Sequence, residues 1–502
     1  MIPHPRPRLA GFPADVCRVA ASRGTVGPAP RPVGWPRRHT LVRSEGGAAM
    51  KLVILGGGGF RVPLVHGALL RDTADRRVTE VVLHDTDSAR LDVMQRVLAA
   101  QAALHPQGPV PPPSVTATTD LDAALAGADF VFSAMRVGGL EGRTADERIA
   151  LDLGLLGQET TGPGGVGYGL RTVPVALDVA QRVCRLAPEA WVINFTNPAG
   201  LVTQAMQSVL GDRVVGICDS PLGLAKRAAG ALGHDLDDLE IDYAGLNHLG
   251  WLTGLRLDGR DLLPDLLADE HALGAIEEGQ LFGTEWLRSL GSLPNEYLFY
   301  YYFTRDAIAQ ITGAPQTRGE YLVGQQADFY AGVADAPEQA WQRWDAVRRD
   351  RNATYMQETR EGDDGQAHER AEADVEGGGY EGVALALMAA IARDEPARLI
   401  LNVRNGGAVA GLPDDAVVEV PCRVDAAGPV PVAVSPLPGH ALGLVQQVKA
   451  VDELVIRAAV EQSRSLAVQA FALHPLVDSV TVARELLTAY ARRLPEHYRR
   501  LA

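Results

Sequence analysis

Long apolar runs are missing from this 502-residue sequence. Charged or turn-forming residues interrupt every apolar stretch well before the roughly 18 residues that a membrane-spanning helix needs, so we expect no membrane partner. Cysteine is also scarce, and Cys17, Cys184, Cys218 and Cys422 have no paired spacing. In a chain of this length, that pattern disfavours a disulfide framework or a structural zinc site and favours a cytoplasmic location.

Positive charge is in short supply as well. The 47 lysines and arginines are outnumbered by 62 aspartates and glutamates, which gives a formal net charge of -15. A protein that binds nucleic acid through its phosphates needs a basic surface, so we expect no nucleic-acid partner. An anionic small molecule would need a local basic pocket. With 46% apolar and 22% charged residues, the sequence is typical of a globular protein with a sizeable core.

The first 49 residues differ in composition from the rest. They contain eight prolines and eight arginines but only two acids, Asp15 and Glu45, and they lack the apolar core of a secretory signal. Ordered periodicity begins directly after Met50. We predict that residues 1–49 are a disordered leader or follow from a start codon assigned too far upstream, with a transit peptide as the alternative.

Beyond Met50, short runs of apolar and β-branched residues alternate with helix-like stretches. The six runs cover residues 52–55, 81–85, 114–118, 129–134, 191–195 and 213–218. This alternation predicts an α/β fold in which residues 50–220 form a parallel sheet covered by helices. After residue 220 the pattern is mixed, which predicts an α+β domain over residues 221–502.

Within this second domain we expect helical segments over residues 265–290 and 336–359 and a long amphipathic helix over residues 444–472. Residues 360–379 are rich in acids and glycine and are expected to form a surface loop.

A glycine cluster follows the first predicted strand and precedes an apolar helix. The cluster and the next residue are Gly56, Gly57, Gly58, Gly59 and Phe60. Backbone amides in such a turn can approach a pyrophosphate, and the N-terminus of the next helix favours its charge. The third glycine of the usual fingerprint is replaced by Arg61. The second strand ends at Asp85, which could accept a hydrogen bond from a ribose 2′-hydroxyl.

The glycine turn and Asp85 together predict a Rossmann-type domain that binds NAD in preference to NADP. The alternative is a glycine turn without a ligand in another doubly wound fold.

Six further segments carry a resemblance to a known family. They are Arg136-Val-Gly-Gly-Leu-Glu-Gly-Arg143, Gly157-Gln-Glu-Thr-Thr-Gly-Pro-Gly-Gly165, Asn194-Phe-Thr-Asn-Pro-Ala-Gly200, Gly216-Ile-Cys-Asp219, Gly245-Leu-Asn-His-Leu249 and Asn295-Glu-Tyr-Leu-Phe-Tyr-Tyr-Tyr302. These segments occur in the order typical of glycoside hydrolase family 4. From Met50 to about residue 480 the sequence resembles that family and is most similar to its 6-phospho-β-glucosidases.

The resemblance implies a mechanism that departs from the usual pair of carboxylates. NAD⁺ takes a hydride from C3 of the sugar, a tyrosine removes the C2 proton, and a divalent metal on the C2 and C3 oxygens stabilises the enediolate. The aglycone leaves by elimination, water adds, and NADH restores the alcohol. The cofactor supplies the hard chemistry, and the protein positions it and stabilises charge.

Cys218 and His248 are the metal ligands that the resemblance implies. A thiolate and an imidazole with open positions for sugar oxygens would form a catalytic metal site. The resemblance implies Mn²⁺, whereas a thiolate by itself favours zinc or iron. Considered singly, Cys218 could also be a buried apolar cysteine and His248 a hydrogen-bonded loop residue.

Tyr297 matches the catalytic base of the family, and Asp219 is a candidate proton donor. A phenol becomes a usable base only if a cation lowers its ordinary pKa of about 10. The neighbouring Tyr300, Tyr301 and Tyr302 are expected to pack their rings as an aromatic strand.

Arg136, Asn197 and Arg318 are the candidate substrate-binding residues. A 6-phosphate calls for forked donors such as Arg136, and Arg143 flanks the same glycine-rich turn. Asn197 follows the fifth strand, where the family places substrate and metal contacts, although it could be only an Asn-Pro turn residue. Arg318 could hold the substrate or lower the pKa of the base; otherwise it pairs with Glu320.

The sequence therefore predicts NAD- and divalent-metal-dependent hydrolysis of a phosphorylated glycoside, a 6-phospho-β-glucoside, by a homodimer or homotetramer. The second domain is expected to contribute to catalysis and oligomerisation. Asp219 after the cysteine is typical of 6-phospho-α-glucosidases, whereas the longer match at the arginine turn and the tyrosine segment favours the β enzymes. The alternatives are a 6-phospho-α-glucosidase or unphosphorylated glycosidase of the same family, a 2-hydroxy-acid dehydrogenase, and a non-catalytic NAD-binding sensor.

Overall fold

The computed structural model describes residues 50–105, 110–355 and 379–501. The predicted leader lies outside the described residues, as does the predicted surface loop apart from Gly379. The described residues belong to a single compact unit, Ala49–Ala502.

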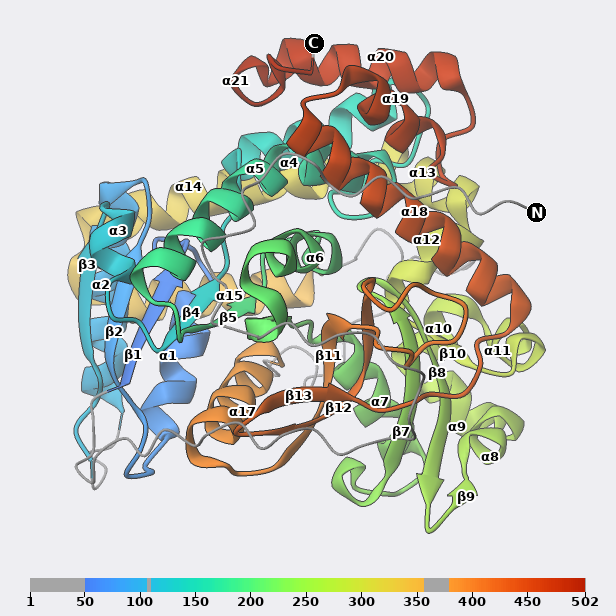
Figure 1. Ribbon diagram of the computed structural model, residues 1–502, viewed down its shortest axis with the longest axis horizontal. Coiled ribbons are helices and arrows are strands. Elements are labelled where there is room, and N and C mark those ends of the chain that lie inside the picture. The colour runs from blue at the N-terminus through green and yellow to red at the C-terminus, as the bar shows by residue number, and fades with distance from the viewer. Residues whose placement is uncertain (1–49, 106–109, 356–378, 502) are drawn as a thin grey trace, which may run out of the picture. The chain divides into compact units, whose positions relative to one another are not determined.

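A thirteen-stranded sheet runs through the described residues in the order β10-β8-β7-β12-β11-β6-β5-β4-β1-β2-β3, with β13 beside β12 and β9 beside β8 (Figure 1). Strands β1 to β6 pair in parallel, and the other pairs are antiparallel. The strands are β1 (Met50–Leu55), β2 (Val78–His84), β3 (Ser114–Thr118), β4 (Phe130–Ser133), β5 (Trp191–Asn194), β6 (Val214–Gly216), β7 (Glu240–Leu246), β8 (Leu249–Leu257), β9 (Arg260–Asp261), β10 (Leu293–Pro294), β11 (Ala397–Arg404), β12 (Val417–Asp425) and β13 (Gly428–Pro431).

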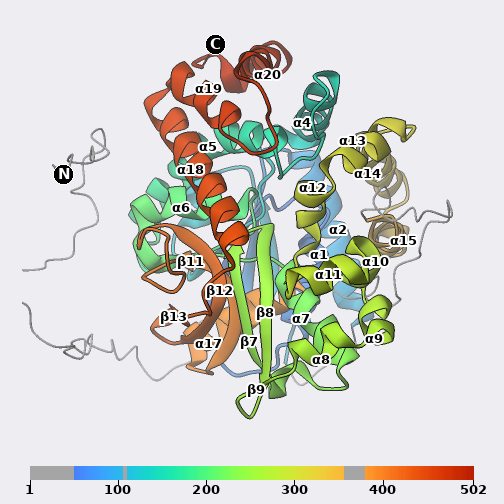
Figure 2. The same cartoon turned by 90° about the vertical axis from the view of Figure 1, so that its right-hand side faces the viewer.

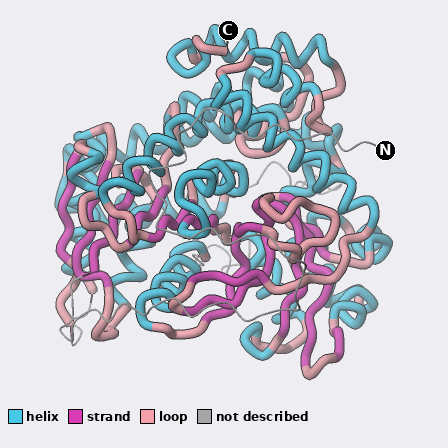
Figure 3. Tube along the Cα trace, in the orientation of Figure 1, coloured by secondary structure: helices cyan, strands magenta, loops and turns pink. Residues whose placement is uncertain are grey.

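The central parallel strands are apolar and buried on both faces. In β1, Leu52, Val53, Ile54 and Leu55 are all fully buried. A strand that is buried on both faces needs a layer of helices on each side, and Figure 3 shows the helices packed around the strands. The predicted α/β fold with a Rossmann-type parallel sheet is confirmed.

The helices cover the sheet and continue past it at the C-terminal end. They are α1 (Val62–Arg71), α2 (Ser88–Leu104), α3 (Leu121–Leu125), α4 (Gly139–Asp152), α5 (Pro163–Leu186), α6 (Ala199–Leu210), α7 (Ser220–Ala231), α8 (Leu263–Ala268), α9 (Glu270–Ala275), α10 (Glu277–Phe282), α11 (Thr284–Leu290), α12 (Phe299–Tyr302), α13 (Thr304–Gly313), α14 (Arg318–Asp335), α15 (Ala340–Ala353), α17 (Tyr380–Arg393), α18 (Gly439–Glu461), α19 (Arg464–Ala472), α20 (Val480–Arg493) and α21 (Pro495–Tyr498). Short 3₁₀ turns lie at Gly211–Arg213, Leu236–Asp238, Glu296–Leu298 and Pro337–Gln339. Within the described residues, no helix combines the length and apolar content that crossing a membrane would require.

Three expectations for the second half need correction. The expected long helix over 444–472 is two helices, α18 and α19, because Gln462 adopts a left-handed conformation with φ of 52° and Ser463 caps the next helix. The region 265–290 forms four short helices, separated at Asp269, Ile276 and Gly283. The tyrosine segment is a 3₁₀ turn followed by α12 and not a strand.

The sheet crosses the domain boundary that we predict at residue 220. Strand β11 pairs with β6 through Asn402 and Gly216, and β12 then pairs with β7. The division into two domains at residue 220 therefore stays a prediction, although the change from parallel to antiparallel pairing falls close to it.

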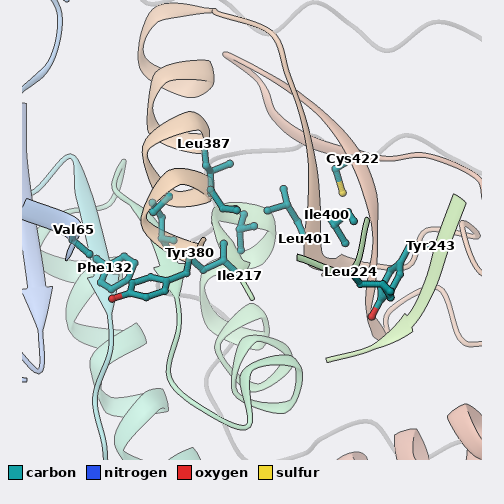
Figure 4. Close-up of a cluster of buried hydrophobic side chains, with 14 of the residues drawn as sticks. Val65, Phe132, Ile217, Leu224, Tyr243, Tyr380, Leu387, Ile400, Leu401 and Cys422 are labelled. Atoms are coloured by element: carbon teal, nitrogen blue, oxygen red, sulfur yellow. The ribbon is translucent and has the colours of Figure 1, made fainter. Parts of the chain in front are cut away.

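Helix α17 packs against α1 of the first half of the chain and against β11 and β12 of the second. Figure 4 shows Tyr380, at the start of α17, beside Phe132 and Ile217, with Leu387 farther along the helix toward Leu401 of β11. The ring of Tyr380 stacks on Phe195 at 4.3 Å between centroids. The second half thus supplies part of the core that supports the carboxyl ends of the parallel strands.

A buried ion pair connects α4 to α5. Asp146 accepts two hydrogen bonds from the guanidinium of Arg171, at 2.7 and 2.6 Å, and both side chains are fully buried. Arg171 also donates to the carbonyl of Val137 at 2.9 Å. The views in Figures 1 and 2 place the C-terminal helices α18, α19 and α20 over this part of α5.

We predict that Asp146→Ala lowers the free energy of unfolding by roughly 3–5 kcal/mol, because it leaves the Arg171 guanidinium buried without a counter-ion. Urea denaturation followed by circular dichroism measures the loss. The double variant Asp146→Leu/Arg171→Met removes both charges and should recover most of it. A double variant as unstable as Asp146→Ala would contradict this explanation.

Candidate functional site

A cavity of about 1510 Å³ lies at the carboxyl ends of the parallel strands. It is lined by the glycine turn after β1, by the loops after β4, β5 and β6, by the β7–β8 turn, and by parts of α14 and α15. All of the sequence-predicted site residues line it except Gly57 and Gly58. Residues far apart in sequence are therefore brought together as expected for ligands of an open α/β sheet.

Each glycine of the turn has a close neighbour. A Cβ on Gly56, which has φ of 80°, would lie 2.6 Å from the carbonyl oxygen of Ala134. Gly57 and Gly58 pack against β2 and α2, where an added Cβ would meet Leu83 or Arg90 at 2.7 Å. Only glycine allows this approach, and the cavity side of the turn stays open.

The glycine amides are used to build the turn itself. Those of Gly56 and Gly57 donate to the carbonyl of His84, that of Gly59 donates to Gly56, and that of Gly58 donates to the Asp85 carboxylate at 3.0 Å. The next two amides, of Phe60 and Arg61, have no acceptor among the described residues. They lie at the N-terminus of α1 and are the donors that this turn can offer to a pyrophosphate.

Cys218 and His248 are both buried at the cavity, with 5% and 8% of their surface exposed. Cys218 follows β6, and His248 occupies the tight β7–β8 turn in a left-handed conformation with φ of 61°. Nearby, the side-chain oxygen of Asn197 is buried and has no hydrogen-bond partner among the described residues.

Two acidic side chains lie near the thiol, and burial raises the pKa of one of them, Glu419, to about 7. Burial, followed by the carboxylates of Glu419 and Asp219, raises the pKa of Cys218 well above its ordinary range. A bound cation would offset both effects and stabilise the thiolate. Among the described residues no group of three or more histidine, cysteine, aspartate or glutamate side chains could hold a metal ion. Cys218 and His248 as metal ligands therefore stay a prediction, and a site built on these two would have to be completed by substrate or water.

The hydrogen bonds around His248 define which ring nitrogen can bind a metal. Gln158 Oε1 accepts from the amides of Thr160 and Thr161, both at 2.6 Å, so this atom must be the oxygen. The Thr160 hydroxyl donates to the same oxygen at 3.1 Å and therefore accepts from His248 Nδ1, also at 3.1 Å. Burial lowers the pKa of His248 to about 3, so the ring is neutral and Nε2 keeps its lone pair.

Tyr297 lies against the imidazole of His248, with ring centroids 3.6 Å apart and planes within 5°. Burial, and then the neighbouring Glu296, raises the pKa of Tyr297 well above its ordinary range. The hydroxyl of Tyr355 donates to the Tyr297 hydroxyl at 2.9 Å and opposes this rise. Sequence reasoning missed Tyr355, because an isolated tyrosine after a charged helix carries no recognisable pattern.

Arg136 and Arg143 share an acidic partner within the cavity. Both donate to the carboxylate of Glu159, Arg143 at 2.6 Å, and Arg143 also binds Glu147 at 2.9 Å. Although burial opposes ionisation, Arg136 and Arg143 lower the pKa of Glu159 to about 2. Both guanidinium groups therefore lie at the cavity with part of their charge neutralised.

Arg318 and Arg351, on α14 and α15, also line the cavity. Arg318 donates to the Thr354 hydroxyl and to the carbonyl of Arg351, both at 2.8 Å. Its alternative partner, Glu320, binds Arg148 instead and completes the N-terminal capping box of α14.

Among the described residues no acid pairs with the Arg351 guanidinium, which lies over the ring of Phe60 at 5.7 Å. Burial and the neighbouring Arg61, Arg318, Arg143 and Arg136 lower the pKa of Arg351 well below its ordinary range. A bound anion would offset the repulsion among these arginines. Sequence reasoning missed Arg351, because α15 is rich in arginine and aspartate and has the composition of a solvated helix.

The fold and the site together define a class of protein: an enzyme with a Rossmann-type sheet, whose dinucleotide turn and thiol–imidazole–phenol group share one cavity. Comparison with known sequences narrows this class. The sequence model described as "Family 4 glycosyl hydrolase" matches residues 51–234, and that of the "Family 4 glycosyl hydrolase C-terminal domain" matches residues 243–477. The chain belongs to family 4 of the glycosyl hydrolases, as the sequence resemblance indicates.

Relatives in this family carry both anomeric specificities in their names. The chain is 33% identical over 465 residues to a probable 6-phospho-beta-glucosidase of Bacillus subtilis, covering 90% of this chain and 99% of the relative. The structure of the 6-phospho-beta glucosidase from Thermotoga maritima with NAD and glucose-6-phosphate is similar with a TM-score of 0.74 and 26% identity, over 89% of this chain and 99% of that one. A 6-phospho-alpha-glucosidase from gut microorganisms in complex with NAD and Mn²⁺ follows at a TM-score of 0.71 and 28% identity, over 89% and 98%.

We predict that Thr160→Val weakens Mn²⁺ binding by roughly 10- to 100-fold, because the His248 ring loses the acceptor that fixes its tautomer. Electron paramagnetic resonance of free Mn²⁺ during titration measures the affinity. Thr160→Ser keeps the hydroxyl and should bind as the unchanged protein does.

Thr172→Val is the matched control for this substitution. Thr172 is fully buried, whereas Thr160 is partly exposed, and the Thr172 hydroxyl has no partner among the described residues. We expect this variant to bind Mn²⁺ normally. Normal binding by Thr160→Val would show that the hydroxyl has no part in the metal site.

Proposed function

We propose that the protein hydrolyses 6-phospho-β-glucosides with NAD and a divalent metal, Mn²⁺, as cofactors. The observation that carries this proposal is the composition of a single cavity. It combines a dinucleotide turn, a buried thiol and imidazole beside a phenol, and an arginine that lacks an acidic partner among the described residues. An ordinary 2-hydroxy-acid dehydrogenase needs neither the thiol–imidazole pair nor the phenol, and a sensor needs no base.

The cofactor-binding residues follow from the geometry of the cavity. The amides of Phe60 and Arg61 would hold the pyrophosphate, and Asp85, which the Gly58 amide fixes at the end of β2, would accept from a ribose hydroxyl. Cys218 Sγ and His248 Nε2 would hold the metal. When bound, NAD⁺ supplies a hydride acceptor, and the metal supplies charge that stabilises neighbouring sugar oxygens.

The side chains of the protein would bind the sugar and move its protons. Tyr297, as its phenolate, would take a proton from the carbon next to the oxidised one and become a neutral phenol. The Tyr355 hydroxyl would stabilise the phenolate before this transfer by donating to it. The unpartnered side-chain oxygen of Asn197 would accept from a sugar hydroxyl. Asp219 lines the cavity beside Arg61, at 3.9 Å, where it would serve a poor leaving group as proton donor.

The substrate phosphate would bind among the arginine side chains that line the cavity. Arg136 and Arg318 are the donors that the sequence predicts, and Arg351 is the one that the structure adds. A phosphate dianion would provide the countercharge that Arg351 lacks among the described residues. The glucose-6-phosphate bound by the Thermotoga maritima relative supports a phosphorylated sugar as the substrate class.

The β-anomer is the finer part of the proposal. It is supported by the arginine turn at 136–139 and the tyrosine segment, and by the β-named Bacillus subtilis relative at 33% identity. Asp219 favours the α-anomer, and α-named relatives reach 30% identity. Elimination that starts from loss of a C2 proton tolerates either anomer. We therefore give the longer match more weight than Asp219 and propose the β-anomer.

We predict that a 6-phospho-β-glucoside has a higher kcat/KM than its α-anomer with the same aglycone, and that both exceed the unphosphorylated sugars. Hydrolysis of nitrophenyl glycosides measures the four rates. Removal of either NAD or divalent metal should abolish all activity, and adding it back should restore it. A preference for the α-anomer would make Asp219 the better guide to specificity, and activity without both cofactors would reject the mechanism.

We predict that Arg351→Gln raises KM for the 6-phosphoglycoside by roughly ten- to hundred-fold, because a hydrogen bond between two charged groups is lost. Hydrolysis of the unphosphorylated sugar should change little. Arg349→Gln is the matched control, since Arg349 lies on the same helix but is exposed and pairs with Asp345. Equal losses on phosphorylated and unphosphorylated substrates would remove Arg351 from the phosphate site.

A further inference from the structure

Three aromatic side chains from the second half of the chain donate hydrogen bonds to the dinucleotide turn. Each comes from a different helix, and each binds a backbone carbonyl of the turn. The bonds are Tyr330 Oη of α14 to Gly58 at 2.6 Å, Trp344 Nε1 of α15 to Phe60 at 2.8 Å, and Tyr380 Oη of α17 to Arg61 at 3.0 Å. Three of the four carbonyls between residues 58 and 61 are thus held from outside the parallel half of the sheet.

Tyr330 and Trp344 lie behind the turn, and neither is among the described residues that line the cavity. Trp344 is fully buried, and its ring lies 5.8 Å from that of Phe60. Tyr330 packs against Phe329 and under the Arg90 guanidinium. Any effect of these two side chains on a bound dinucleotide must therefore pass through the turn.

The orientation of the peptide planes explains what the donors do. In a trans peptide, the carbonyl and the following N–H point in opposite directions. Trp344 holds the Phe60 carbonyl toward α15, so the N–H of Arg61 points away from α15. This N–H and that of Phe60 are the two amides of the turn that have no acceptor among the described residues. Trp344 therefore fixes the Arg61 amide, one of the two that an anion at the N-terminus of α1 would use, and Tyr330 and Tyr380 hold the peptide planes on either side of this part of the turn.

We propose that Tyr330, Trp344 and Tyr380 are positioning residues that retain the dinucleotide, because they lock the turn in its binding geometry and slow cofactor release. The inference rests on the proposed use of NAD. In that function the dinucleotide returns to its starting oxidation state in every cycle, so slow exchange does not limit turnover. A preorganised turn also binds without losing backbone freedom, which lowers the entropic cost of binding.

Release of NADH from the full-length protein tests this proposal. Stopped-flow fluorescence with excess NAD⁺ as the competitor measures the dissociation rate. Tyr330→Phe and Tyr380→Phe each remove one hydroxyl and keep the ring, and each should accelerate release by roughly three- to ten-fold. The double variant should exceed both single variants.

Tyr498→Phe is the matched control. Tyr498 donates to the carbonyl of Gly167 at 2.6 Å, the same distance and bond type as Tyr330, but its partner lies in α5 and not in the turn. We expect this variant to release NADH within about two-fold of the unchanged rate, since the loss of one buried hydrogen bond acts only locally.

Two results would overturn the proposal. One is an unchanged release rate in both single variants and in the double variant. The other is equal acceleration by Tyr498→Phe, which would show that general loss of stability is the cause. Failure of the unchanged protein to bind NADH would instead reject the proposed function on which the inference rests.

Discussion

Gly216 and Asn402 face each other where β6 meets β11, and this pairing joins the parallel and antiparallel halves of the sheet. A Cβ on Gly216 would lie 2.7 Å from that of Asn402, so only glycine allows the strands to approach. Asn402 donates to the Glu419 carboxylate at 2.8 Å, and Glu419 in turn contributes to the raised pKa of the Cys218 thiol. The cavity forms because this strand pairing places the second half of the chain against the carboxyl ends of the parallel strands.

Charge divides the cavity into two environments. Carboxylates gather near Cys218, where they favour a cation, and arginines gather around Arg351, where they favour an anion. Glu159 accounts for the close approach of Arg136 and Arg143, since one ionised carboxylate satisfies both guanidinium groups. A substrate with a sugar ring at one end and a phosphate at the other matches this arrangement, because a cation near Cys218 would hold the neutral sugar oxygens and the arginines would hold the phosphate.

The first half of the chain supplies the dinucleotide turn, and the second half holds it in place. The same helices that carry Tyr330 and Trp344 also carry Arg318 and Arg351, so cofactor geometry and the proposed phosphate site share a scaffold. Tyr355, just beyond α15, then reaches Tyr297. The packing of α14 and α15 therefore affects the dinucleotide turn, the proposed phosphate site and the surroundings of Tyr297.

Sequence alone determined the parallel sheet, its glycine turn and the residues that reach its edge, because strand periodicity and the glycine pattern are local and follow from backbone sterics. Its motifs also predict Cys218, His248 and Tyr297 as site residues, and the fold brings these three side chains to one cavity. Tertiary structure alone decided that Thr160 orients His248, that Glu159 occupies Arg136, and that Arg351 lacks an acidic partner among the described residues. These three features depend on side chains from distant elements that lie together in a buried space, where the local dielectric and the distances determine the interaction energies. No local sequence pattern predicts such contacts.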